Sequence, residues 1–178
     1  TQVGLLTTWA TASAGFRFCL AVKTDGTLWS WGDGAEGATG LGSTVDISSP
    51  TQVGALTTWS KVSGGQFFSI AVQTNGTLWS WGKNDSGQLG LNNKTYYSSP
   101  KQVGSLTTWS TVFAGREQAY AIKTTNSLWS WGDNSSGQLG DGTTINKIQP
   151  TQITSTAYDT IQAGVVNTMG SSNNSLYA

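Results

Sequence analysis

Histidine is absent from this chain of 178 residues, and cysteine occurs once, at Cys19. A single cysteine excludes an intrachain disulfide and leaves too few thiols for a zinc cluster. Without histidine, the usual general base and the usual partner of a cysteine nucleophile are both missing. We therefore expect a protein that is not an enzyme and that binds no metal or cofactor.

Charged residues are also scarce. Nine basic residues balance nine acidic ones, so the formal net charge at pH 7 is zero. A nucleic-acid-binding face normally needs clustered lysine and arginine, because phosphate neutralisation supplies most of its affinity. Here the basic residues are scattered, so we expect no nucleic-acid partner. The chain also lacks an apolar run of about 18 residues, so we expect no membrane insertion.

What the chain does contain is a repeat. The stretch LWSWGKNDSGQLG, residues 78–90, recurs 50 residues later as LWSWGDNSSGQLG and 50 residues earlier as LWSWGDGAEGATG. A period of this length is typical of a repeat array rather than of one ordinary core. We divide the single array, residues 1–178, into units 1–50, 51–100, 101–150 and a shorter fourth unit, 151–178. In the fourth unit Tyr158 takes the place of Trp109.

The periodicity inside each unit is that of β-strands. In residues 67–73, FFSIAVQ, every second residue is apolar, then Asn75-Gly76 follows and LWSWG alternates again. This pattern predicts a β-hairpin with an Asn-Gly turn of type I′. In the third unit Thr125-Asn126 lacks the glycine that this geometry favours, so we expect a looser turn there.

Two further short strands are expected in each unit. One lies about Trp59 and Val62, and the other begins at the proline of the SPTQVG stretch, where the missing N–H does least harm. Four short strands in 50 residues predict an all-β fold, with each unit forming one blade of a β-propeller.

These residues resemble a known family. The V-x-A-G step, an apolar strand, a D/N-G turn, the motif LW-x-WG-x-N-x-x-G-Q-L-G and a closing proline are similar to the regulator of chromosome condensation (RCC1) repeat. The resemblance implies β-propeller blades of about 50 residues, so this chain of 178 residues would hold about 3.5 of them, whereas the founding member is a seven-bladed propeller. That member is a nucleotide-exchange factor for a small GTPase and binds chromatin. The family commonly has histidine where this chain has Phe18, Phe68 and Gln118.

The repeated tryptophans allow two interpretations. Alternation puts Trp79 and Trp81 on one face of their strand, and in a propeller each blade is covered on both faces, which favours packing between blades. The alternative is an exposed aromatic platform for sugars or bases. We favour the structural core, which would include all nine tryptophans: Trp9, Trp29, Trp31, Trp59, Trp79, Trp81, Trp109, Trp129 and Trp131.

The polar loop after each WG pair is expected to be a structural turn. Asn84 and Asn134 can bond local backbone groups; a weak cation site is the alternative. Asp33 and Asp133 are expected to be turn residues rather than an acid–base pair.

The segments that differ most between units are residues 43–49, 92–99 and 143–149. Tyr96 and Tyr97, in the second of them, are our candidates for a contact loop. The alternative is that both are partly buried at a strand edge.

About three and a half blades leave a ring open, so the terminal blades would expose apolar faces. Either the chain is a processed or excised piece of a longer polypeptide, or copies associate. We expect a non-catalytic interaction or structural module that binds a protein partner or itself. Near-identical units and a polar surface suit a secreted, cell-surface or virion assembly. A regulatory propeller with an intracellular protein partner and a carbohydrate-binding module remain the alternatives.

Overall fold

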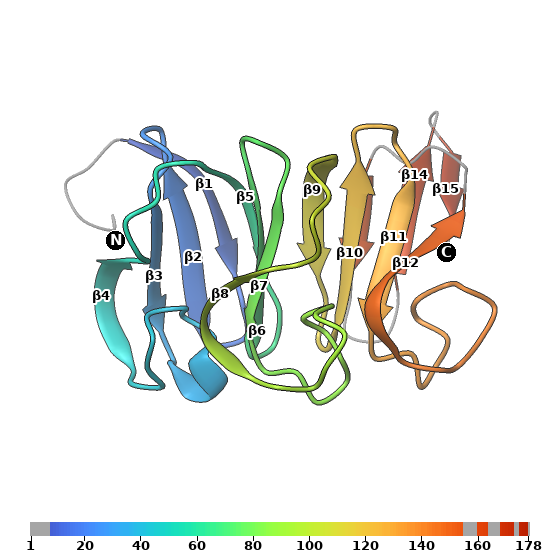
Figure 1. Cartoon of the computed structure of the whole chain (residues 1–178), viewed down its shortest axis with the longest axis horizontal. Helices are drawn as coiled ribbons and strands as arrows, with labels where there is room; N and C mark the ends of the chain where they lie inside the picture. The colour runs from blue at the N-terminus through green and yellow to red at the C-terminus, as the bar shows by residue number, and fades with distance from the viewer. Residues whose placement is uncertain (1–7, 155–159, 164–167, 173–174, 178) are drawn as a thin grey trace.

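The computed structural model describes residues 8–154, 160–163, 168–172 and 175–177 (Figure 1). Three four-stranded antiparallel sheets are followed by a three-stranded one, and they stand side by side without closing a ring. The predicted all-β fold of four-stranded blades is thus confirmed. Tyr158 lies outside the described residues.

Each of the first three sheets takes its strands in chain order from one edge to the other. The first sheet contains β1 (Trp9–Ala14), β2 (Phe18–Lys23), β3 (Leu28–Gly32) and β4 (Ile47–Gln52). The second contains β5 (Trp59–Gly64), β6 (Phe68–Gln73), β7 (Leu78–Gly82) and β8 (Tyr97–Gln102). The third contains β9 (Trp109–Ala114), β10 (Gln118–Lys123), β11 (Leu128–Gly132) and β12 (Lys147–Thr154). The fourth contains β13 (Thr160–Ala163), β14 (Thr168–Ser172) and β15 (Ser175–Tyr177), and a 3₁₀ helix, η1 (Ala35–Gly37), lies between β3 and β4.

The predicted hairpin forms, but its turn is not of type I′. Gly76 donates its N–H to the carbonyl of Gln73 and has a φ of 79°, so it closes a four-residue turn instead of forming its centre. Asn126 holds the same left-handed conformation in the third unit, with a φ of 61°, and keeps the hydrogen bond to Lys123. The turn without glycine is therefore not looser, because asparagine tolerates this conformation better than most residues.

The sequence suggested that the outer strand of each unit begins at its proline. In the first three units the proline instead lies inside that strand. Pro50 is the fourth residue of β4, since the pairing of Ile47 with Gly32 begins the strand three residues earlier. The register shifts between this pair and the next, Ser30 with Thr51. An edge strand with such an irregularity can accept a residue that has no N–H.

Two different faces alternate through the molecule. In the first sheet the aliphatic face is formed by Phe18, Leu20, Val22 and Leu28, and it packs on the second sheet. The opposite side of each of the first three sheets is the tryptophan face. In the second sheet it contains Trp59, Val62, Ala71, Trp79 and Trp81. The second sheet then packs its own aliphatic face on the tryptophan face of the third. The cores therefore lie between neighbouring sheets, and contacts among β1, β5, β9 and β13 bring the first strands of all four sheets together.

A buried serine ties the long loop of each unit to its sheet. Ser30, Ser80 and Ser130 donate their hydroxyl groups to the carbonyls of Thr39, Leu89 and Leu139, over 2.7, 2.7 and 3.1 Å. All three serines are fully buried. The serine of the LWSWG motif thus fixes the loop that follows β3, β7 and β11.

Candidate interaction surfaces

Three tryptophans form one cluster in each of the first three sheets. In the second sheet the Trp59 ring centroid lies 5.9 Å from that of Trp79 and 6.1 Å from that of Trp81, both in edge-to-face arrangements. Trp109 makes the equivalent contacts in the third sheet and Trp9 in the first. Such pairs contribute about 0.5–1.5 kcal/mol beyond the area that they bury.

The inner tryptophan of the motif also bonds to the preceding sheet. Trp81 donates its indole N–H to the carbonyl of Ala38 over 2.9 Å, and Trp131 donates to Gln88 over the same distance. Gly40 allows this approach, since a Cβ there would lie 2.6 Å from Nε1 of Trp81. The glycine that ends the motif is therefore required by the tryptophan of the next unit.

The tryptophan face of the first sheet is uncovered among the described residues. Trp81 and Trp131 are fully buried, whereas Trp31 is only half-buried and has no carbonyl partner of this kind in the described part of the chain. Trp9 is also half-buried, although Trp59 and Trp109 are 3% exposed. Cys19, the residue that pairs with Trp31, is partly exposed where Ser69 and Ala119 are fully buried. The first sheet thus presents a tryptophan face, whereas the equivalent faces of the second and third sheets are covered by the preceding sheet.

A lysine packs over two of the tryptophan clusters. Nζ of Lys23 lies 3.6 Å from the ring centroid of Trp29, and Nζ of Lys123 lies 3.7 Å from that of Trp129. Burial lowers the pKa of Lys123. The sequence did not predict these cation–π contacts, although a lysine before the D-G or T-N turn was a visible signal.

The long loops are held by a buried asparagine, as the sequence predicted. Asn84 is fully buried, donates to the carbonyls of Asn93 and Thr95, and accepts from the N–H of Leu89. Asn134 makes the corresponding bonds in the third unit, to Thr143, Ile145 and Leu139. The side-chain oxygen of Asn84 and the loop carbonyls, which are the atoms that a cation would bind, are therefore already used in hydrogen bonds. Within the described residues no three histidine, cysteine, aspartate or glutamate side chains gather as metal ligands would.

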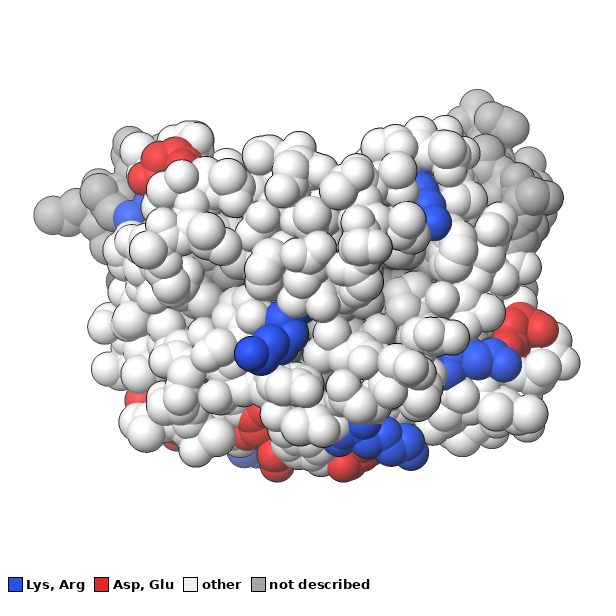
Figure 2. Space-filling model, viewed as in Figure 1, with Lys and Arg blue, Asp and Glu red and all other residues white. Residues whose placement is uncertain are grey.

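Charged side chains gather at the end of the sheets where the long loops lie, along the lower rim in Figure 2. Nζ of Lys83 lies 2.7 Å from Glu117 and 3.4 Å from Asp85. Although burial opposes it, the bonds to Glu117 and Asp85 raise the pKa of Lys83. This ion pair joins the long loop of the second unit to the β9–β10 turn of the third.

The two candidate tyrosines lie differently. Tyr96 is 36% exposed and bonds Asp85 through its hydroxyl group. Burial and this bond raise the pKa of Tyr96, and the same bond lowers the pKa of Asp85. Tyr97 is the first residue of β8 and packs against the core between the second and third sheets. Only Tyr96 belongs to the charged rim.

Asp141 carries the most strongly perturbed carboxylate of the third loop. Burial disfavours its charge, but bonds from Lys147, Thr143 and Asn134 outweigh it and hold the pKa of Asp141 below its ordinary value of 3.8. Nζ of Lys147 lies 2.9 Å away. The second loop has Leu91 at the equivalent position, so its asparagine bonds Asn93 instead.

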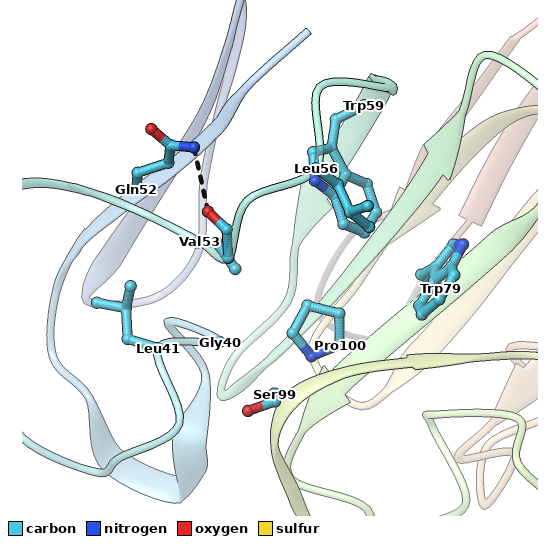
Figure 3. Close-up of a pocket in the computed structure, with 10 residues that line it drawn as sticks. Gly40, Leu41, Gln52, Val53, Leu56, Trp59, Trp79, Ser99 and Pro100 are labelled. Carbon is cyan, nitrogen blue, oxygen red and sulfur yellow. Dashed lines mark hydrogen bonds between the residues drawn. The ribbon is translucent and has the colours of Figure 1, made fainter.

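Two equivalent grooves lie between neighbouring sheets, on the side of the outer strands. The first has a volume of about 320 Å³ and the second about 330 Å³. Figure 3 shows Trp59, Trp79, Pro100, Leu41 and Val53 around the first groove. The second is lined by the residues 50 positions later, among them Trp109, Trp129 and Pro150. Sequence reasoning missed these grooves, although a leucine recurs before each TTW.

Leu56 and Leu106 each line a groove, and both side chains are 46% exposed.

No helix among the described residues is long and apolar enough to cross a membrane.

Solved structures share this architecture. Human WBSCR16 matches with a TM-score of 0.85 and 21% identity, over 96% of this chain and 46% of that one. Yeast RCC1 (Prp20) bound to Kap60 matches with a TM-score of 0.84 and 17% identity, over 96% and 43%. Prp20p from Saccharomyces cerevisiae, described with its binding properties to Gsp1p and histones, matches with a TM-score of 0.75 and 20% identity, over 84% and 39%. This chain thus spans less than half the length of these proteins, and no curated protein matches it.

The family models align with the repeat itself. One model of the regulator of chromosome condensation (RCC1) repeat matches residues 25–72, 75–122 and 126–165, running from the β2–β3 turn of one sheet into the next. A second matches residues 10–38, 59–88 and 109–138, which cover, except for Trp9, the first three strands of the first, second and third sheets. The chain belongs to the regulator of chromosome condensation (RCC1) repeat family.

Proposed function

We propose that this chain is a non-catalytic interaction module whose first sheet binds a further blade of the same kind. The half-buried Trp31, whose indole N–H has no carbonyl partner among the described residues, carries this proposal. Its counterparts at the next two sheets are buried and bonded, so the face has every feature of a blade interface except the second partner.

The chemistry of the covering surface can be inferred from the two complete interfaces. It would present an aliphatic face like that of Phe68, Ile70 and Val72, together with a loop carbonyl placed like that of Gln88. Trp9 and Trp31 are already partly buried, so covering them removes from water only the apolar surface that is still exposed, at about 25 cal/mol per Å². This gain favours a protein partner over a polar ligand.

The covering blade has two possible sources, the rest of a longer polypeptide or a second copy. An interface in which an aliphatic face meets a tryptophan face is heterologous, so copies joined by it would form a ring or a filament. Such growth would suit a secreted, cell-surface or virion assembly. The alternative is a regulatory propeller completed within one chain that binds an intracellular protein.

Light scattering at rising protein concentration separates these sources. Self-association predicts a mass that grows to a multiple of 18.7 kDa. The variant Trp31→Glu would stay at the mass of one chain, because the new charge would be buried in the interface. Val45→Glu is the control, since Val45 is 63% exposed and lies in the loop between η1 and β4. A folded single chain at every concentration would contradict self-association.

A further inference from the structure

We propose that the two grooves between neighbouring sheets bind an uncharged, proline-rich peptide in the polyproline II conformation. The site is separate from the tryptophan face of the first sheet. Its volume is at the lower end of the range of about 300–1,000 Å³ that is usual for ligand pockets.

The walls of the first groove are apolar and uncharged. Leu56, Trp79, Pro100 and Val53 supply most of them, and the polar side chains are Gln52 and Ser99. Among the described residues no charged side chain lines either groove, although Figure 2 shows single basic side chains away from the lower rim and Nζ of Lys123 lies 3.7 Å from the ring centroid of Trp129 in the second groove. A ligand that carries charge would lose hydration here without finding a counter-ion, so the groove favours an uncharged ligand.

Each groove also contains a buried donor without a partner. The indole N–H groups of Trp59 and Trp109 are buried and lack a hydrogen-bond acceptor among the described residues. In Figure 3 the nitrogen of Trp59 lies on the side of the ring toward Val53. A buried unpaired donor costs about 1–3 kcal/mol, and the same cost recurs at Trp109 and, in the first sheet, at Trp9. The groove therefore favours a ligand that brings an acceptor.

Two other side-chain donors of the first groove are already used. Trp79 donates its indole N–H to Thr77, and Gln52 donates its amide to the carbonyl of Gly54. A ligand rich in donors, such as a sugar with its many hydroxyl groups, would need more acceptors than the groove offers.

A proline-rich peptide satisfies all three conditions. It brings carbonyl acceptors, its prolines have no N–H to satisfy, and its rings pack on tryptophan and leucine. Because the polyproline II helix exists before binding, little conformational entropy is lost. The equivalence of the grooves allows one long peptide or two short ones to bind, and a bivalent ligand gains from its raised effective concentration.

The test is a calorimetric titration of the full chain with a peptide of about ten prolines, which is about 31 Å long. A glycine–serine peptide of equal length is the control ligand, because it is not preorganised. We expect binding of the proline peptide alone, with little change on adding salt. Binding of both peptides, or of neither, would overturn the proposal.

Two leucine variants locate the site. Leu56→Ser and Leu106→Ser should each weaken binding or halve the number of sites, and the double variant should abolish it. Ile145→Ser is the matched control, because Ile145 is 67% exposed and lines neither groove. Both leucines are also substantially exposed, so the variants should fold. Unchanged affinity in the double variant would overturn the proposal.

Trp59→Phe with Trp109→Phe tests the donor. Loss of the indole N–H should weaken peptide binding about fivefold per groove. Because phenylalanine is smaller than the buried indole, some loss of unfolding free energy is also expected, and urea denaturation checks that the variants still fold. Binding of a β-linked glucose oligosaccharide that the leucine variants abolish would instead identify a sugar site and contradict the peptide assignment.

All of these titrations can be made below the concentration at which copies associate, so a failure here would leave the blade-binding proposal intact.

Discussion

The tryptophan faces of the first and second sheets each contain three equivalent tryptophans, but their surroundings differ. Trp81 is covered by the aliphatic face of the sheet before it, while Trp31 is partly in contact with water. The sequences around them, LWSWG in both cases, are identical. Burial of this motif is therefore decided by the neighbouring sheet and not by the motif itself, as expected for a repeat array whose units stabilise one another.

The largest effect should come from truncating the covered tryptophan. Trp81→Ala should lower the free energy of unfolding by about 3–5 kcal/mol, because it leaves a cavity and removes the bond to Ala38. Trp31→Ala should cost about 2 kcal/mol or less, since the side chain is already partly hydrated. Urea denaturation at low protein concentration measures both, and equal losses would show that the two faces do not differ.

The glycine that faces Trp81 provides a second comparison. Gly40→Ala should cost about 3 kcal/mol, from a left-handed φ of 76° and from the clash with Trp81. Gly54→Ala has a similar φ of 61° but open space around its Cβ, so about 1 kcal/mol is expected. The same denaturation measurement would refute the close packing of this interface if both variants lost equal stability.

A third comparison concerns the long loops of the second and third units. The lowered pKa of Asp141 means that its stabilisation is fully present above the ordinary value of 3.8 and is lost gradually as pH falls from there through the lowered pKa of the folded state. Asp141→Asn should lose about 2 kcal/mol at pH 7 and a smaller amount at pH 2, where only part of the stabilisation remains. Leu91 holds the equivalent position in the second unit and has no charge to titrate. Equal destabilisation by Asp141→Asn at both pH values would contradict the role of the carboxylate.

The smallest effect is expected at the ion pair between the second and third units. Glu117→Gln should cost about 0.5–1 kcal/mol at low salt and less at about 1 M salt, because both partners are partly solvated. The junction of the first and second units has Asp33 and Phe67 at these places and forms no such pair. A loss that does not change with salt would argue against an electrostatic origin.

The sequence predicted the strands because alternation and turn residues are local signals. It also predicted the bonding of Asn84, since asparagine oxygens commonly bond loop backbone. It did not predict the position of Pro50, because the start of β4 is set by pairing with Gly32 across the sheet. The grooves were not foreseen either, since the walls of the first come from four strands and two connecting segments far apart in the chain.

The most direct test of the open face is the reactivity of Cys19, the single thiol of the chain. It pairs with Trp31, so a covering blade would shield it. Reaction with a maleimide should be fast in the isolated 178-residue chain at low concentration. It should be strongly slowed in the protein whose first sheet is covered, which is either the self-associated chain or a longer polypeptide that contains it. A thiol that reacts equally fast in both would mean that the tryptophan face of the first sheet remains uncovered, and the proposed function would be wrong.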